Sequence, residues 1–308
     1  MATASRLRCV RAELDRLDPE RDHERMAHLL LEVRYGNSLF AAAAYTLAFL
    51  RQMSIPSIAR TVHRSGTGDI MRMTRQRNDD TLVFFGEILR CGYTSARGGE
   101  VIDRLNEIHA RYRISNDQNL YTLASLSLEA RRIAEVLGVE IMSGRELDAL
   151  YFFWRGVGER MGITEIPPSS ADFMNWTRQY ERDNATFTTG GRAVADAMIA
   201  DFAARFPRPL RSAGSVLLLS ICDDDLLAAH RLSRPTRRRR AIALRALRAY
   251  LFAVRVLPDP GDRSWVDLFG RTTAYPDFGR IGQSRHSVAR DASQSASSTP
   301  SSVRGGSV

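Results

Sequence analysis

The sequence contains no lysine, because all 44 of its basic residues are arginine. Without lysine, the protein cannot form a Schiff base with a substrate and cannot build a lysine-dependent phosphate loop. Cysteine is also scarce: Cys9, Cys91 and Cys222 lie far apart and form no C-x-x-C pair. This usage is typical of a reducing compartment, so we predict a cytoplasmic protein, peripheral to a membrane at most.

Long apolar runs are missing as well. The longest, residues 38–50, lies between Arg34 and Arg51 and is shorter than the roughly 20 residues that span a bilayer. It therefore predicts a buried helix. Residues 1–17 carry no apolar run and so do not resemble a secretory signal. Alternating β-branched runs joined by Asn-Gly or Asp-Gly turns are absent, so nothing predicts a hairpin.

The 308 residues are 44% hydrophobic and 26% charged, a balance typical of a globular protein with a large core. We predict an all-α fold, with one large helical domain over residues 1–258 and a largely disordered tail rich in Pro, Ser and Gly over residues 259–308. The helical periodicity covers residues 5–33, 37–53, 71–90, 97–114, 117–137, 144–161, 172–182, 192–206, 209–232 and 236–256.

The spacing of motifs argues against several enzyme classes. His23 and His28 are five residues apart and cannot share a zinc ion from one helix face. Gly66 and Gly68 lack the third glycine of a dinucleotide loop, and no G-x-S-x-G elbow is present.

The net charge of +9 is concentrated near the end of the helical region, where residues 231–255 hold nine arginines and no acid. The run Arg237–Arg240 opens a basic amphipathic pattern, which predicts contact with an anionic membrane surface. The alternative is the solvated end of a core helix. Because no nucleic-acid-binding module surrounds the run, we predict no nucleic-acid partner.

Two predicted helices carry polar groups on an apolar face. Arg77 and Thr81 share a stripe with Phe84 and Ile88, and His109 lies on the apolar stripe of the next helix. A buried Arg needs a counter-ion, and a buried His needs a hydrogen bond or a metal. One interpretation is structural: Arg77 pairs with an acid such as Asp80 or Glu87, and His109 is a hydrogen-bonded core residue.

A resemblance favours a second interpretation. Four segments in order, LRQMSIPSIARTVHRSGTG from Leu50, RQRNDDTLVFFGEIL from Arg75, LNEIHARYRISNDQNLYTL from Leu105 and FFWRGVGERMGITEIP from Phe152, resemble the MpaB and latex-clearing-protein oxygenase family. The resemblance covers roughly residues 30–210 and implies a globin-like helical core that holds haem b.

Within that resemblance, His109 matches the proximal iron ligand, and Arg77 and Thr81 match the distal Arg and Thr. Asp80 stands where the rubber-cleaving branch has a lysine, so the chain is more similar to the MpaB branch. Asn106 and Arg113 flank the His109 face and are candidates for contact with the haem propionates, with a surface or capping role as the alternative.

The resemblance implies a haem-dependent oxygenase or peroxygenase that uses dioxygen or peroxide on an apolar, unsaturated substrate of isoprenoid or lipid type. Arg77, Thr81 and Asp80 are the predicted catalytic residues. Two alternatives stay open: a non-catalytic haem-binding sensor or carrier, and a cofactor-free peripheral membrane or interaction protein.

Overall fold

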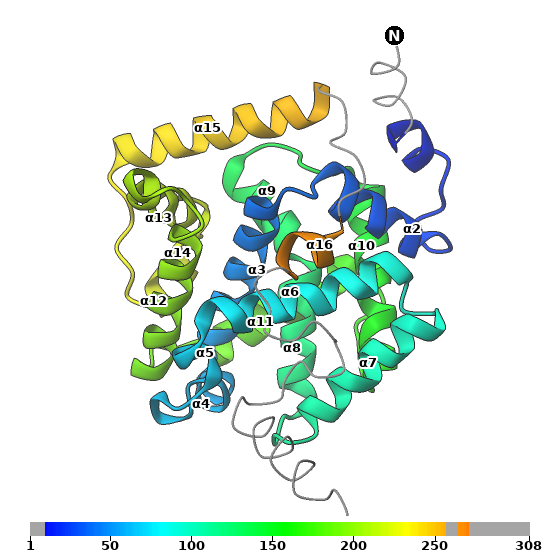
Figure 1. The fold of residues 1–308 in the computed structure, drawn as a ribbon, viewed down its shortest axis with the longest axis horizontal. Coiled ribbons are helices and arrows are strands. Elements are labelled where there is room, and N and C mark those ends of the chain that lie inside the picture. The colour runs from blue at the N-terminus through cyan, green and yellow to red at the C-terminus, as the bar shows by residue number, and fades with distance from the viewer. Residues whose placement is uncertain (1–9, 257–263, 271–308) are drawn as a thin grey trace, which may run out of the picture.

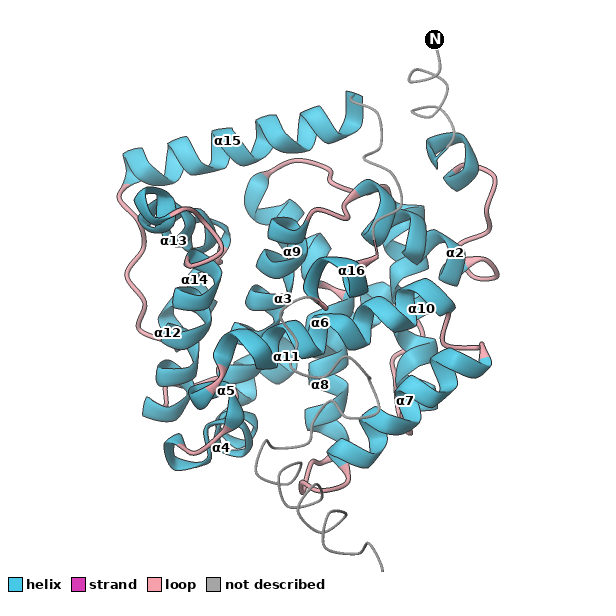
Figure 2. Cartoon of the chain, viewed as in Figure 1, coloured by secondary structure: helices cyan, strands magenta, loops and turns pink. Residues whose placement is uncertain are grey.

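A computed structural model describes residues 10–256 and 264–270 of the chain. These two ranges contain helices and loops and no strand (Figure 2), which confirms the predicted all-α class. In chain order the elements are α2 (His23–His28), the π-helix η1 (Leu29–Arg34), α3 (Ser38–Met53), α4 (Pro56–His63), η2 (Arg64–Gly66), α5 (Asp69–Arg72), α6 (Thr74–Cys91), α7 (Ala96–His109), α8 (Asn116–Ser127), α9 (Glu129–Leu137), α10 (Gly144–Arg160), α11 (Ser170–Asn184), α12 (Thr189–Ala203), η3 (Arg208–Leu210), α13 (Arg211–Ile221), α14 (Asp224–Ala229), α15 (Arg237–Val256) and α16 (Trp265–Phe269).

Helix α3 forms the centre of the core, as its long apolar run predicts. It packs against α8, α9 and α12, while α6 packs against α7 and α10 against α8 (Figure 1). Its side chains Leu47 and Leu50 are fully buried. None of the helices in the described ranges is long and apolar enough to cross a membrane.

Local chemistry divides three of the predicted helices. The predicted helix over residues 5–33 is interrupted between residues 15 and 22, where the Asp18 carboxylate accepts hydrogen bonds from the next backbone amides. The predicted helix over residues 117–137 breaks at Leu128. The predicted helix over residues 209–232 breaks at Cys222, after which Asp223 caps α14 by accepting from the Leu226 amide at 2.8 Å.

Helix α16 corrects the predicted tail. Trp265 and Phe269 are buried, and α16 packs on α6 at Gly86, where an added Cβ would lie 2.8 Å from the Cβ of Trp265. The buried Glu32 carboxylate accepts hydrogen bonds from Ser264 Oγ and the Trp265 amide, both at 2.8 Å. The prediction of disorder is wrong for residues 264–270, which belong to the domain; the rest of residues 259–308 lies outside the described ranges.

Candidate functional site

His109 is the last residue of α7 and borders a cavity of about 260 Å³. The remaining lining comes from the end of α7, the following loop, the start of α8 and the turn after α10. It includes Asn106, Tyr112, Ile114, Asn119, Met161 and Ile163. The cavity therefore combines apolar walls with amide side chains and one imidazole.

Two hydrogen bonds between a side-chain amide and the backbone hold this wall of the cavity together. Asn116 Nδ2 donates to the Thr164 carbonyl at 3.0 Å, and the Thr164 amide donates to Asn116 Oδ1 at 2.9 Å. A reciprocal capping box between Ser115 and Gln118 starts α8 at this point. These bonds fix the loop that brings Ile163 to the cavity, and they give a structural role to Asn116, which lies in the segment from Leu105 that resembles the oxygenase family.

The His109 side chain makes no hydrogen bond to any residue in the described ranges, although most of the side chain is shielded from solvent. Burial lowers the pKa of its imidazole, and the positive charge of Arg77 lowers it further. The ring is thus neutral near pH 7 and keeps a lone pair that can bind a metal. The alternative of a hydrogen-bonded core histidine does not describe this side chain.

Arg77 and Thr81 lie one turn apart on α6. Arg77 Nη1 donates to Thr81 Oγ1, and Thr81 Oγ1 lies 3.0 Å from the Arg77 carbonyl, to which it can donate. Arg77 is exposed, so the expectation of a buried guanidinium is wrong. The alternative pairing with Glu87 is also wrong, because Glu87 pairs with Arg90 at 2.6 Å and with Arg97 at 3.7 Å.

Tyr45 on α3 lies beside this pair and was not singled out from the sequence. Its hydroxyl is buried without a hydrogen-bond partner, since the neighbouring Thr81 hydroxyl does not reach bonding geometry. Burial raises the pKa of Tyr45, so the phenol stays protonated. Aromatic rings continue from it to Phe49, Phe85 and Trp154, with centroid separations of 5.7 Å from Tyr45 to Phe49, 6.4 Å from Tyr45 to Phe85 and 5.3 Å from Phe85 to Trp154.

The other predicted site residues fall in different places. Asn106 lines the cavity one turn before His109, as expected for a residue flanking the ligand face. Arg113 is exposed and is not among the residues that line the cavity. Asp80 is buried on α6, with 4% of its surface exposed. The structure therefore brings Asn106 and His109 to one cavity and leaves Arg113 at the surface.

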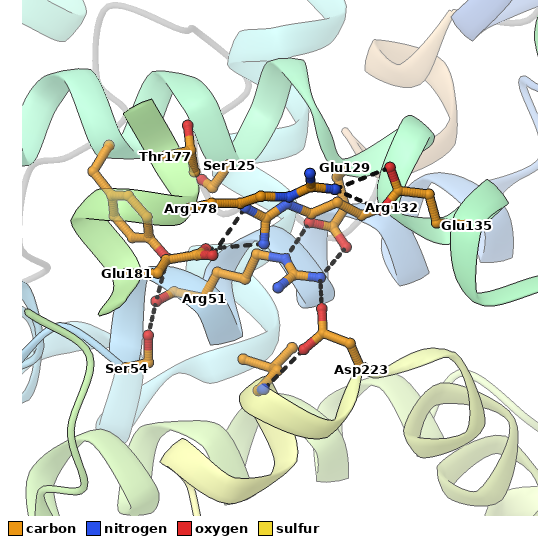
Figure 3. Close-up of polar contacts among 12 residues, drawn as sticks. Arg51, Ser54, Ser125, Glu129, Arg132, Glu135, Thr177, Arg178, Glu181 and Asp223 are labelled. Atoms are coloured by element: carbon orange, nitrogen blue, oxygen red, sulfur yellow. Dashed lines mark hydrogen bonds and ion pairs between the residues drawn. The ribbon is translucent and has the colours of Figure 1, made fainter. Parts of the chain in front are cut away.

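A second polar cluster joins five helices and shares no residue with the lining of the cavity (Figure 3). Arg51 on α3 pairs with Glu129 of α9 and with Asp223, both at 2.7 Å, and Glu181 of α11 accepts from Arg132 at 2.9 Å. Tyr121 of α8 donates to the same Glu181 carboxylate at 2.9 Å. Every charged side chain drawn in this cluster has a partner within the protein. We therefore assign the cluster a structural role, in which it ties the helices together, and not a role in binding.

Residues 33–256 match the family described as ER-bound oxygenase mpaB/B'/Rubber oxygenase, catalytic domain. The chain belongs to this family. It is 25% identical to ER-bound oxygenase mpaB' of Penicillium brevicompactum over 229 residues, which cover 69% of the chain and 54% of that relative. It is 28% identical to ER-bound oxygenase mpaB of the same fungus over 143 residues, which cover 44% of the chain and 36% of that relative. It is 23% identical to ER-bound oxygenase mpaB of Penicillium roqueforti (strain FM164) over 198 residues, which cover 59% of the chain and 66% of that relative. Of the two Penicillium brevicompactum relatives, the chain thus spans about half of one and about a third of the other.

The cofactor that this family implies can be compared with the residues present. A haem takes one or two axial ligands from the protein, so it does not need a cluster of ligating side chains. The described ranges hold no group of three or more His, Cys, Asp or Glu side chains suited to a metal ion. They do hold a neutral imidazole without a hydrogen bond at a cavity and an unpartnered buried phenol near Arg77. The chemistry of His109 therefore suits an axial haem ligand, whereas Arg77, Thr81 and Tyr45 are not among the residues that line its cavity.

Proposed function

We propose that this chain is a haem b-dependent oxygenase or peroxygenase that acts on an apolar, unsaturated substrate of isoprenoid or lipid type. The observation that carries the proposal is His109: a neutral imidazole without a hydrogen-bond partner, at a cavity, in a chain of an oxygenase family.

In this proposal a ring nitrogen of His109 would hold the iron, and the haem would supply the oxidative chemistry with dioxygen or peroxide. Arg77 supplies a fixed positive charge next to the site, and Thr81 orients that guanidinium through their hydrogen bond. Asp80 precedes Thr81 in sequence, is buried on α6 and is retained as an acidic residue of the proposed site. Asn106 places an amide on the cavity wall, where it can bind a carboxylate of the cofactor or a polar group of the substrate.

The aromatic rings that extend from Tyr45 give the proposal its substrate class. Tyr45, Phe49, Phe85 and Trp154 form a continuous apolar cluster beside the Arg77–Thr81 pair. Tyr45 and Trp154 are buried, and none of the four rings lines the cavity at His109, so the cluster supports an apolar surrounding for the site and supplies no binding space of its own. Because apolar substrates of this type partition into membranes, we extend the proposal to a peripheral position at an anionic membrane surface.

The test is the visible spectrum of protein purified from haem-supplied cells, for the wild type, His109→Ala and the control His63→Ala. His63 is the last residue of α4 and is not among the residues that line the cavity. We expect a Soret band at near-stoichiometric haem in the wild type and the control, and its loss in His109→Ala. Circular dichroism shows whether each variant is folded. A folded wild type that binds no haem on titration would overturn the proposal, and stoichiometric haem without turnover of any unsaturated apolar substrate would favour the sensor or carrier.

A further inference from the structure

Helix α15 runs along one edge of the molecule, at the top of Figure 1. The helix packs on α13, and the side chains buried on its inner face include Leu244 and Leu251. Arg248 fastens the helix by donating to the Leu137 carbonyl, with its Nε at 2.9 Å. These contacts fix the inner face and define which side chains point outward.

The outer face carries large apolar side chains in the open. Ile242, Phe252 and Val256 expose 56%, 66% and 53% of their surface, and they are three of the four large hydrophobic residues exposed in the described ranges. At the helical step of roughly 100° per residue, all three fall within about 80° of one another. They form a stripe directed away from the core, where exposure of Phe252 costs free energy unless something covers it.

Arginines surround this stripe. Arg238 and Arg245 fall on the same outer face, and Arg237 and Arg239 are exposed at its start. None of these four makes a side-chain hydrogen bond or ion pair with another described residue, in contrast to Arg248. The sequence has no acidic residue from 226 to 258. The face is thus both apolar and cationic, without an internal counter-ion.

We infer that the outer face of α15 is a membrane-contact surface for an anionic lipid bilayer. The guanidinium groups of Arg238 and Arg245 bind lipid phosphates, while Ile242, Phe252 and Val256 enter the boundary between headgroups and acyl chains. The helix lies flat on the bilayer, and its rise of about 1.5 Å per residue makes the contact roughly 30 Å long. This inference locates the membrane contact within the proposed function but does not depend on haem.

The charge of the face argues against two other occupants. A second copy of the chain, packed around a two-fold axis, would place this arginine-rich face against itself and repel. A nucleic acid would bind the guanidinium groups but would leave Phe252, Ile242 and Val256 exposed to water. Only a surface that is both anionic and apolar satisfies both sets of side chains.

The placement of α15 also determines how the domain would sit. In Figure 1, α15 lies along the top edge and α7, which ends at His109, lies in the lower part of the molecule. Contact through α15 therefore anchors the domain by the edge that lies away from α7 in this view.

The experiment is co-sedimentation of the full chain with phosphatidylcholine vesicles, with and without phosphatidylglycerol. Each basic residue near an anionic surface contributes about fivefold to partitioning at physiological salt. We expect Arg238→Gln/Arg245→Gln to lower the partition coefficient by roughly 25-fold, and Phe252→Ser to lower it as well. Matched controls are Arg182→Gln and Leu210→Ser, in which an exposed arginine of α11 and a leucine 51% exposed on η3 are changed; both should bind like the wild type.

The inference is overturned if the wild type binds both vesicle types equally or neither, or if the controls lose as much binding as the α15 variants. It is also overturned if Phe252→Ser abolishes self-association in sedimentation velocity and leaves vesicle binding intact. Because all the changed side chains are exposed, thermal melts should coincide with the wild type. Vesicle binding measured on haem-free protein keeps this result separate from the outcome for His109.

Discussion

Arg77 on α6 and His109 at the end of α7 are coupled by charge: the guanidinium adds to burial in lowering the pKa of the imidazole. The two helices pack against each other, so residues 32 positions apart in sequence act on one site. The consequence is an imidazole that stays neutral and available without a hydrogen bond to hold it. A cation that disfavours protonation thus favours the neutral form of His109, which is the form that the proposed haem site requires.

The first prediction removes that charge. In haem-free protein, Arg77→Gln should raise the pKa of His109 toward its ordinary value, because one of the two causes that lower it is gone. Histidine proton NMR against pH measures this, with Arg90→Gln, at the far end of α6, as the control. In the haem-loaded protein we expect turnover to fall by about 10²–10³ with the Soret band retained. An unchanged titration of His109 would show that the two side chains are not coupled.

The second prediction concerns the Tyr45 hydroxyl. Tyr45→Phe removes a buried hydroxyl that has no partner in the haem-free fold, so the free energy of unfolding should stay constant or rise by up to about 1 kcal/mol. Loaded with haem, the same variant should shift the CO-stretching band of the carbonyl complex, because a donor near the ligand is lost. Urea unfolding and infrared spectroscopy measure the two effects. Destabilisation above about 2 kcal/mol would show that the hydroxyl is bonded in the folded protein.

Sequence periodicity predicted the helices well because each amphipathic pattern reports the burial of its own face. It predicted the burial of Arg77 wrongly. A stripe of apolar residues shows which face of a helix turns inward, but it does not show at which residue of α6 that face leaves the core. Helix α16 was missed because its five residues are too short for a periodic signal and lie in a Pro- and Gly-rich segment. The burial of the Tyr45 hydroxyl and the pairing of the Arg51 cluster depend on residues far apart in sequence, which local patterns do not encode.

The third prediction tests the buried cluster around Arg51. Arg51→Met leaves Glu129 buried without its main counter-ion, so the free energy of unfolding should fall by about 3–5 kcal/mol. The matched control is Arg155→Met, which removes a surface pair with Glu159 at 2.8 Å and should cost less than about 1 kcal/mol. Urea denaturation followed by circular dichroism gives both values. Equal, small losses would mean that the cluster is solvated in the folded protein.

The fourth prediction uses His230, which is 1% exposed and whose Nε2 donates to the Leu50 carbonyl at 2.8 Å. Burial lowers the pKa of His230 in the folded state, so below about pH 6.5 the unfolded chain binds the extra proton first. Stability should therefore fall as the pH drops from about 6.5 toward the lowered pKa, by at most about 1.4 kcal/mol per pH unit. His230→Gln should flatten this slope in urea titrations of haem-free protein. The same slope in both proteins would contradict the prediction.

The fifth prediction measures how much α16 contributes to the stability of the fold. A chain ending at Gly270 keeps Trp265 and Phe269, and a chain ending at Asp262 loses both buried rings. The shorter chain also leaves the buried Glu32 carboxylate without the Ser264 hydroxyl and the Trp265 amide. We expect it to lose at least about 3 kcal/mol of unfolding free energy relative to the chain ending at Gly270. If the shorter chain fails to fold, Gly86→Ala in the full chain tests the same contact, because its added Cβ would lie 2.8 Å from Trp265 Cβ. Equal stability of the two shortened chains, or full stability of Gly86→Ala, would show that α16 adds nothing to the fold.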